Sequence, residues 1–339
     1  MKQISSIRFA AFLLAIFMML SLFLAACGDG ETEETTVGET EAETTDADTE
    51  AETTKSEETD PDTAEPVPEP DPDPLKQQTL RVGDKDYAGF EVLINDVEEG
   101  LVVSRVTGYT AWGQYYEGKI MLIDDPSRVF VGAIPESRRG PNGIGYRLPE
   151  FFDHYDVVAG INGSGFGDAN GEGLGGYLIG VCYYEETPWY GDGSYYTSVA
   201  FTIDDKLIVG GNEVWNNNKI RDGVQFGPYL IKDGVRANNS PVSVQPRTAI
   251  GQREDGVVAF LVIDGRPDLS SSPSQGCDFS DLEQIMEKYQ MINASCCDGG
   301  ASSAICYNRE LITMNSSMNP SVGRLLPNAF LVRHKTDKN

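Results

Sequence analysis

The sequence is poor in histidine, in basic residues and in long apolar runs, and each shortage excludes a class of protein. It has two His residues and no C-x-x-C pair, which argues against a zinc site of the common structural kind. Lys and Arg number 26 against 53 Asp and Glu, so a nucleic-acid partner, which needs a basic face, is not expected. The apolar run from Phe9 to Leu24 is shorter than the roughly 20 residues of a transmembrane helix.

The net charge of −27 is concentrated in one tract, residues 28–75, which holds 19 acidic residues and one Lys. Residues 1–27 carry +2 and residues 76–339 carry −11 (23 basic and 34 acidic residues). The acidic tract consists mainly of Thr, Glu, Asp, Ala and Pro and has no aromatic residue. It cannot bury enough apolar surface to offset chain entropy, so we expect a disordered, extended tether.

The first 27 residues have the form of an export signal. Lys2 and Arg8 precede the apolar run, which ends in Leu24-Ala25-Ala26-Cys27. This ending resembles the lipobox of bacterial lipoproteins, which implies acylation of Cys27, a membrane anchor and a location on the outer face of the cytoplasmic membrane, towards the cell wall. An ordinary signal peptide with a chance Cys is the alternative. We therefore divide the chain into a lipoprotein signal peptide (1–27), a tether (28–75) and one folded domain (76–339).

The folded part is rich in Gly and in short strand signals. Apolar runs separated by turn residues predict hairpins at 200–209 and 248–263, strands at 120–123, 128–131, 156–161 and 228–231, and a short helix near 148–154. The clearest helix begins at Ser280, with Ser280 and Glu283 as a capping box and Leu282, Ile285, Met286 and Tyr289 on one face. The fold class is therefore α+β: strand-dominated mixed sheets with a few flanking helices, in a single domain.

Five cysteines remain if Cys27 is acylated: Cys182, Cys277, Cys296, Cys297 and Cys306. Export makes disulfides possible, with at most two bridges and one free thiol. Neighbouring cysteines seldom bond to each other, so we expect Cys296 and Cys297 to pair elsewhere, for example with Cys277 or Cys306. The connectivity cannot be read from the sequence.

Four segments, in this order, carry a resemblance to a known family. They are G-K-I-M-L-I-D-D-P-S-R-V-F-V-G at 118–132, G-I-N-G-S-G-F-G-D-A-N-G-E-G-L-G-G at 160–176, F-G-P-Y-L-I-K-D-G with P-R-T-A-I-G-Q and L-V-I-D-G-R within 226–266, and N-A-S-C-C-D-G-G-A-S-S-A-I-C-Y-N-R-E-L at 293–311. Together they resemble the phosphodiester glycosidase family over about residues 118–333. Three positions depart from the family pattern: Ser164 is inserted in Asn-Gly-Gly-Phe, Cys296-Cys297 replaces Asn-Leu, and Ala301 replaces Gly or Ser.

The resemblance implies a hydrolase that splits a sugar-1-phosphodiester into free sugar and a phosphomonoester. Such a site needs a carboxylate beside the anomeric carbon and cations or amides around the phosphate. Asp298 is the first candidate carboxylate and Asp264, at a strand end, the second. Each Asp can also be a turn-former that bonds its own backbone.

The candidate substrate-binding groups are charged, polar or Gly residues in the same segments. A guanidinium fork fits phosphate oxygens, and a Gly pair can offer backbone amides, although the arginines can equally form structural ion pairs. Asn162 is a candidate for binding a sugar hydroxyl or for capping its loop. The full set is Asn162, Gly163, Arg247, Thr248, Arg266, Gly299, Gly300, Ser302 and Ser303.

Asp168, Asn170 and Glu172 alternate in a Gly-rich loop, as the first ligands of a calcium loop do. The full twelve-residue pattern is missing, so the loop is either a solvated turn or a site for Ca²⁺. No other cofactor is expected. The Tyr- and Trp-rich stretch 183–196 is typical of sugar-binding surfaces and also of ligand-free irregular loops.

Other catalytic mechanisms have little support in the sequence. The serine-nucleophile motif G-x-S-x-G does not match around Ser164, because Asn162 stands at its first Gly position, and the motif S-x-x-K is absent from the sequence. His154 is expected to be a packing residue. The predicted function is hydrolysis of a sugar-1-phosphodiester in cell-envelope or extracellular glycans, with a carbohydrate or glycan-phosphate partner. The alternatives are a non-catalytic surface glycan-binding lipoprotein on the same fold and a glycosidase for neutral sugars.

Overall fold

The computed structural model describes residues 80–335, except Glu172, residues 194–196 and Asn218. The predicted signal peptide, Cys27 and the acidic tether lie outside the described residues. All described residues belong to one compact unit, Val67–Asn339. Within the described residues, we find no helix whose length and apolar character would suit a membrane span.

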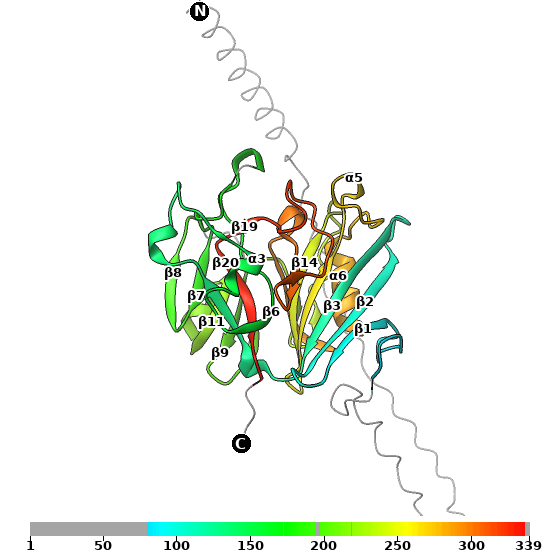
Figure 1. The fold of residues 1–339 in the computed structure, drawn as a ribbon. Helices are drawn as coiled ribbons and strands as arrows, with labels where there is room; N and C mark the ends of the chain where they lie inside the picture. The colour runs from blue at the N-terminus through cyan, green and yellow to red at the C-terminus, as the bar shows by residue number, and fades with distance from the viewer. Residues whose placement is uncertain (1–79, 172, 194–196, 218, 336–339) are drawn as a thin grey trace, which may run out of the picture. The chain divides into compact units, whose positions relative to one another are not determined.

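Strands dominate the structure, and each strand pairing within the sheets is antiparallel (Figure 1). The largest sheet runs, in spatial order, β1 (Glu91–Asp96), β2 (Leu101–Tyr109), β3 (Tyr115–Ile123), β15 (Val258–Ile263), β14 (Arg247–Arg253), β16 (Met291–Cys297), β12 (Tyr229–Lys232) and β13 (Val235–Arg236). The strand-dominated α+β class predicted from the sequence is confirmed.

Two five-stranded sheets and one short ribbon complete the unit. One sheet orders β10 (Leu207–Gly210), β9 (Ser198–Thr202), β11 (Ile220–Gln225), β7 (Val181–Tyr184) and β8 (Thr187–Tyr190). The other orders β18 (Glu310–Leu311), β17 (Ile305–Tyr307), β6 (Val157–Asn162), β20 (Asn328–Arg333) and β4 (Val129–Ala133). The ribbon pairs β19 (Leu325–Leu326) with β5 (Tyr146–Arg147).

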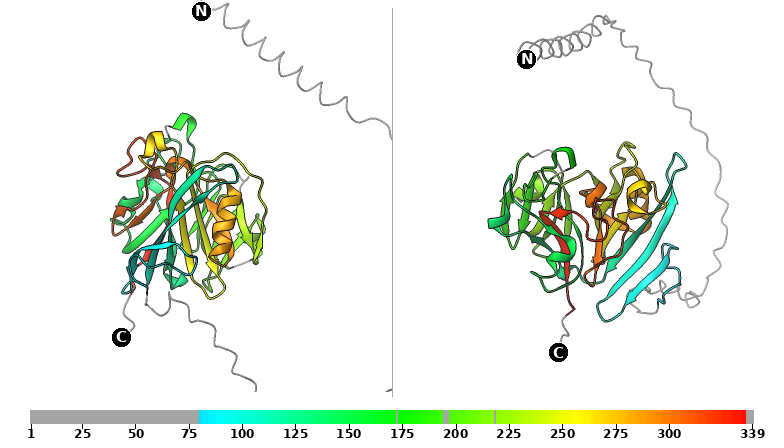
Figure 2. Two further views of the ribbon diagram at one scale, coloured as in Figure 1. Left: turned by 90° about the vertical axis from the view of Figure 1, so that its right-hand side faces the viewer. Right: turned by 45° about the horizontal axis from the view of Figure 1, so that its top comes forward.

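The helices are few and mostly short: α3 (Leu148–Phe151), α4 (Glu213–Asn217), α5 (Pro267–Ser270) and α6 (Phe279–Lys288). Helix α6 packs on the eight-stranded sheet, as Figures 1 and 2 show. Its predicted apolar face is buried, but the predicted cap is wrong. The capping box is formed by Asp278 and Asp281, two residues before Ser280 and Glu283, because Glu283 is buried and bonds to Arg236 and Asn239 instead.

Both faces of the eight-stranded sheet are buried, which is why its central strand is apolar at every position. In β15, Val258, Phe260 and Val262 join the core shared with the five-stranded sheets. The alternating residues Ala259, Leu261 and Ile263 join the core beneath α6. The same alternation sends Cys296 to the α6 side and Cys297 to the other side.

The five described cysteines are all buried and free, so the disulfides expected from the sequence are not formed in the structure. Strand geometry gives the reason for the vicinal pair: Cys296 and Cys297 point into different cores. Burial raises the pKa of the Cys296 thiol to about 12, so this thiol is not ionised at neutral pH.

The predicted hairpins 200–209 and 248–263 form as β9–β10 and β14–β15. The two runs on either side of Asp124–Ser127 also become strands, but they do not pair: β3 joins the large sheet and β4 joins a five-stranded sheet.

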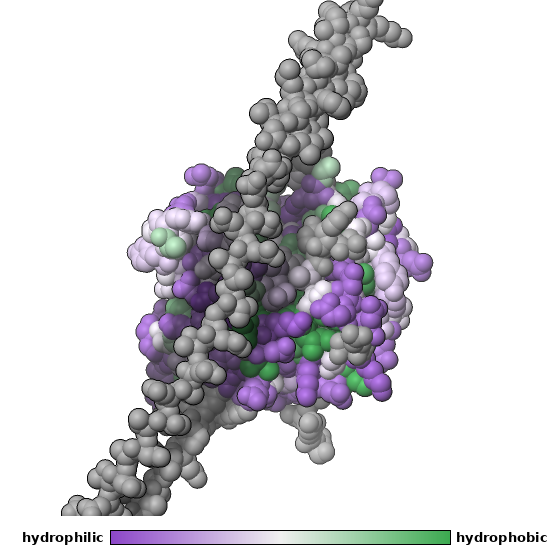
Figure 3. All heavy atoms as spheres, turned by 180° about the vertical axis from the view of Figure 1, so that it is seen from behind, coloured by the Kyte–Doolittle hydropathy of each residue, from purple (hydrophilic) through white to green (hydrophobic). Residues whose placement is uncertain are grey.

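On the face seen from behind, hydrophilic side chains cover most of the coloured surface and apolar ones form small separate patches (Figure 3).

Candidate functional site

The candidate site lies where strands of two different sheets end together. β6 ends at Asn162 and β16 ends at Cys297, and the main-chain N–H of Asp298 donates a 2.8 Å hydrogen bond to the carbonyl oxygen of Gly163. Because β14 is antiparallel to β16, the beginning of β14 lies beside the end of β16, with Thr248 opposite Cys297. Segments far apart in the sequence therefore meet at Asp298.

Asn162 is the central brace of this junction. Its side chain is fully buried, and its amide nitrogen donates to the carbonyl oxygen of Asp298 at 2.6 Å. Its amide oxygen accepts from the Thr248 hydroxyl at 2.8 Å and from the N–H of Ala304 at 3.2 Å. Both Asn162 and Thr248 thus use their polar groups on the protein itself, which favours positioning over substrate contact.

Gly163 permits the close approach of two strands. A Cβ on this residue would collide with the side-chain oxygen of Asn328, which accepts a 2.8 Å hydrogen bond from the N–H of Ser164. The inserted Ser164 is buried and also exchanges hydroxyl hydrogen bonds with Asn328. Ser164, the residue that departs from the family pattern, is therefore accommodated inside the core by its hydrogen bonds with Asn328.

Asp298 faces a cleft of about 580 Å³, here called the Asp298 cleft. Its lining includes Arg147, Asp168, Arg266, Asp298–Ser302, Ser316–Asn319 and Arg324. A smaller hollow of about 400 Å³, here called the Arg247 hollow, is lined by Phe226, Gln245, Arg247, Arg266, Phe279 and residues 296–300. Arg266, Asp298, Gly299 and Gly300 line both, so Asp298 stands on the ridge that the two spaces share.

The carboxyl group of Asp298 is electrostatically unusual. Burial raises its pKa to about 6, against the lowering effects of hydrogen bonds from Ser302 and from the N–H of Gly299 and of the Arg324 charge. A carboxyl group with a pKa near neutrality can both accept and release a proton at physiological pH. This is the property expected of a catalytic carboxylate in a cleft.

Asp264 lies elsewhere. It follows β15, its side chain is buried, and it is not among the described residues that line either space. One carboxylate oxygen accepts a 3.0 Å hydrogen bond from the N–H of Met314, and burial raises the pKa of the group to about 7. The structure therefore does not bring the two predicted carboxylates together in one cleft. Through its hydrogen bond from Met314, Asp264 holds the main chain just before the cleft segment Ser316–Asn319.

The two predicted phosphate clamps both line the Arg247 hollow. Arg247 donates to the carbonyl oxygens of Ser243 and Cys277 at 2.7 and 3.3 Å. Arg266 donates twice to the side-chain oxygen of Gln245, at 2.9 and 2.7 Å. Within residues 80–335 as described, neither guanidinium has a carboxylate partner, so both positive charges stay uncompensated by direct pairing.

The predicted amide nest at Gly299 and Gly300 is occupied by the protein. The N–H of Gly299 donates to the Asp298 carboxylate at 3.0 Å, and that of Gly300 donates to the carbonyl oxygen of Pro246 at 2.8 Å. Ser302 is buried against Asp298, and the Ser303 hydroxyl is buried without a hydrogen-bond partner among the described residues. Gly300, with φ +60°, makes the turn that places these groups.

The loop predicted as a calcium site contributes to the Asp298 cleft through Asp168. Its two carboxylate oxygens accept hydrogen bonds of 2.6 and 2.9 Å from Arg324. Glu172 and the side chain of Asn170 lie outside the described residues, and no group of three or more His, Cys, Asp or Glu suited to a metal occurs in the part that is described. Calcium binding stays a prediction.

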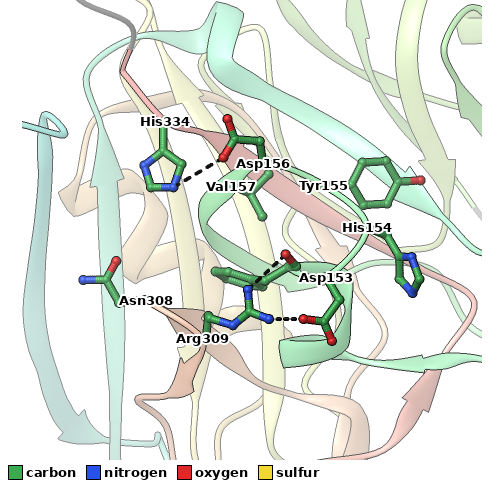
Figure 4. A pocket seen from close by; sticks show the side chains of 9 residues that line it. Asp153, His154, Tyr155, Asp156, Val157, Asn308, Arg309 and His334 are labelled. Atoms are coloured by element: carbon green, nitrogen blue, oxygen red, sulfur yellow. Dashed lines mark hydrogen bonds and ion pairs between the residues drawn. The ribbon is translucent and has the colours of Figure 1, made fainter.

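A third hollow, of about 550 Å³, contains both histidines and none of the predicted site residues. Figure 4 shows Arg309 bonded to Asp153 and His334 beside Asp156. The ring nitrogen of His334 lies 3.9 Å from the Asp156 carboxylate. The ring of His154 stacks on Tyr146 at 4.3 Å between centroids, as expected of a packing residue. Because its charges are paired with one another, we do not assign this hollow to the reaction.

Sequence reasoning missed Arg324, Arg147 and the segment Ser316–Asn319, which form much of the cleft wall. Arg324 follows Gly323 in a loop before β19, and nothing local distinguishes it from a surface Arg. Its hydrogen bond to Asp168, 156 residues away in the sequence, is what identifies it as part of the cleft wall.

The chain is similar in sequence to known proteins. A profile described as phosphodiester glycosidase matches residues 155–333, more than half of the chain. The SPbeta prophage-derived uncharacterized protein YomE of Bacillus subtilis (strain 168) is 30% identical over 160 residues, or 43% of this chain. The match spans 23% of that longer relative.

One solved structure shows the same fold. The catalytic domain of zebrafish N-acetylglucosamine-1-phosphodiester alpha-N-acetylglucosaminidase, auto-inhibited by its pro-peptide, aligns with a TM-score of 0.55 and 15% identity, covering 69% of this chain and 83% of that one. A hypothetical protein from Synechocystis aligns with a TM-score of 0.49 and 12% identity, over 73% and 64% of the two chains. The resemblance predicted from four sequence segments is confirmed: the chain belongs to the phosphodiester glycosidase family.

Proposed function

We propose that this protein is an exported hydrolase, tethered to the membrane through acylated Cys27, that cleaves sugar-1-phosphodiester bonds in cell-envelope or extracellular glycans. Family membership supports a glycosidase-type function. The observation that carries the finer proposal is the position of Asp298 on a ridge shared by two spaces, with Arg266 lining both of them. Arg247 and Arg266 have no carboxylate partner among the described residues, whereas Arg324 of the Asp298 cleft is paired with Asp168.

The two spaces suit the two halves of the substrate. An anionic phosphate gains most from guanidinium groups that are not already neutralised, so it belongs beside Arg247 and Arg266. The sugar then lies in the larger Asp298 cleft, with its anomeric carbon at the ridge. A phosphomonoester is a good leaving group, so the reaction needs a carboxylate at the anomeric carbon more than it needs a strong acid.

The step is a hydrolysis. The bond between the anomeric carbon and the phosphate oxygen breaks, the bonding electrons leave with the phosphomonoester, and the oxygen of water becomes the anomeric hydroxyl. Asp298, as a carboxylate, acts as the base or the nucleophile beside the anomeric carbon, and Ser302 and Gly299 hold it in place by hydrogen bonds. Asn162 positions the main chain of Asp298.

The direct test is to incubate the full chain with methyl phosphodiesters of several sugar-1-phosphates, with and without Ca²⁺, and to measure free sugar by chromatography. Release of free sugar supports the proposal. Release that requires Ca²⁺ and is lost with a chelator would support the calcium prediction. Saturable polysaccharide binding with no released sugar under any condition would instead favour a glycan-binding lipoprotein.

A further inference from the structure

Asp168 and Arg324 form a rigid, paired fork at the wall of the Asp298 cleft. Two parallel hydrogen bonds of 2.6 and 2.9 Å join the carboxylate to the guanidinium. The N–H of Gly173 donates to the Asp168 carboxylate at 2.7 Å, and Arg324 donates to the carbonyl oxygen of Gly173 at 3.0 Å. The Arg324 guanidinium also lies over the Phe166 ring, 4.9 Å from its centroid. These contacts fix both side chains before any ligand arrives.

The pair does not serve mainly to set the charge of Asp298. Arg324 lowers the pKa of Asp298 and Asp168 raises it, so the two effects oppose each other. The pair is also a poor phosphate site, because Asp168 already neutralises Arg324, whereas Arg266 is bonded only to a neutral amide oxygen. A neutral fork of fixed acceptors and donors is suited to neutral hydroxyl groups.

A third polar group of the same cleft is unused by the protein. The Ser316 side chain is buried, its hydroxyl has no hydrogen-bond partner among the described residues, and Ser316 lines the Asp298 cleft. A buried hydroxyl without a partner costs free energy, so a ligand that bonds it gains from the cleft. Ser316, Asp168 and Arg324 together offer both hydrogen-bond donors and acceptors on the wall of the cleft that also holds Asp298.

We propose that the Asp168–Arg324 pair, with the Ser316 hydroxyl, binds the hydroxyl groups of the sugar and thereby determines which sugar is hydrolysed. This inference rests on the proposed function, and it gives that function a specificity site distinct from the phosphate clamps. Oδ1 of Asp168 already accepts two hydrogen bonds, but Oδ2 accepts one and keeps a lone pair for a hydroxyl hydrogen. A site built to bond a hydroxyl discriminates against a sugar that lacks it or places it differently, because the buried Ser316 hydroxyl is then left unpaired.

The experiment compares wild-type protein with Asp168→Asn, Arg324→Lys and Ser316→Ala on the methyl phosphodiesters of glucose-1-, galactose-1-, mannose-1- and N-acetylglucosamine-1-phosphate. Each variant should lose about 10- to 100-fold in kcat/KM on the preferred sugar, mainly through KM, and much less on the poor sugars. The preference among the four sugars should therefore flatten. Arg324→Lys keeps the charge and removes the fork, so it separates hydroxyl geometry from charge.

The matched control is the Asp153–Arg309 pair of the third hollow, changed to Asp153→Asn and Arg309→Lys, which should leave all four kcat/KM values unchanged. Binding of the four free monosaccharides, measured by saturation-transfer NMR, provides a readout independent of turnover. Turnover by the wild type with a sugar preference that the variants retain, or with no preference at all, overturns this inference and leaves the proposed function standing.

The remaining outcomes show whether the proposed function fails while the sugar site stands, or whether both fail. No turnover by the wild type, combined with monosaccharide binding that is lost in the variants, overturns the proposed function and supports the sugar site. Neither turnover nor binding by the wild type overturns both. Melting temperatures of all variants show whether a loss reflects unfolding.

Discussion

The side-chain amide of Asn162 donates a 2.6 Å hydrogen bond to the main-chain carbonyl oxygen of Asp298, and so ties the end of β6 to the end of β16. The two strands belong to different sheets. The same amide group accepts a hydrogen bond from Thr248 at the start of β14. One buried side chain thus holds the ridge on which the candidate carboxylate stands.

Replacing Asn162 with Ala should destabilise the protein by roughly 2–4 kcal/mol, because three partners lose their hydrogen bonds in a buried place. Denaturant unfolding measures the change. The control is Asn216→Ala on the exposed face of α4, which should change stability by less than about 0.5 kcal/mol. Equal stability of the two variants would contradict the bracing role.

Replacing Asp298 with Asn should lower kcat by at least about 100-fold, because the amide is neither a base nor a nucleophile. The fold should be kept, since the amide oxygen can still accept the hydrogen bond from Gly299. Wild-type kcat/KM should rise as the pH rises through about 6, where the carboxyl group ionises. Asp268→Asn on α5 is the exposed control. Activity that falls through pH 6 would make Asp298 an acid instead.

Replacing Arg247 with Ala should lower kcat/KM for a sugar-1-phosphodiester by about 10- to 100-fold, the effect of one or two charged hydrogen bonds. An uncharged aryl glycoside of the same sugar should be affected little, because it offers no phosphate. Arg105→Ala, on the exposed side of β2, is the matched control. Equal losses on both substrates would show that Arg247 supports the fold or the sugar and not the phosphate.

Asp264→Asn tests the buried carboxyl group as a stability element. Burial raises its pKa to about 7, so between about pH 4 and pH 7 the folded state holds a proton that the unfolded state has lost. Wild-type stability should therefore fall as the pH rises through this window. The Asn variant has no titrating group at this position. Its free energy of unfolding should therefore rise by on the order of 2 kcal/mol, relative to that of the wild type, between pH 4 and pH 8. Unfolding curves at several pH values measure the difference; parallel pH profiles would contradict it.

Local patterns in the sequence predicted eight of the 20 strands in the described residues, because an apolar run between turn residues depends only on its neighbours. The β14–β15 hairpin follows from two apolar runs around a turn that ends in Gly256. The sequence did not show that β3 and β4 enter different sheets, because an apolar run carries no information about its pairing partner. The helix cap was misassigned because Ser280 and Glu283 fit the same pattern as Asp278 and Asp281, and only burial of Glu283 decides between them.

Short contiguous motifs in the sequence were enough to identify the family and the strand-rich class, because such motifs are local. Only the tertiary structure decided which groups share a cleft. It placed Asp264 in the core, showed the amides of Gly299 and Gly300 to be engaged, and brought Arg324 to Asp168. The physical reason is that a cleft is formed by residues distant in sequence, and their contacts depend on how sheets pack and not on local order.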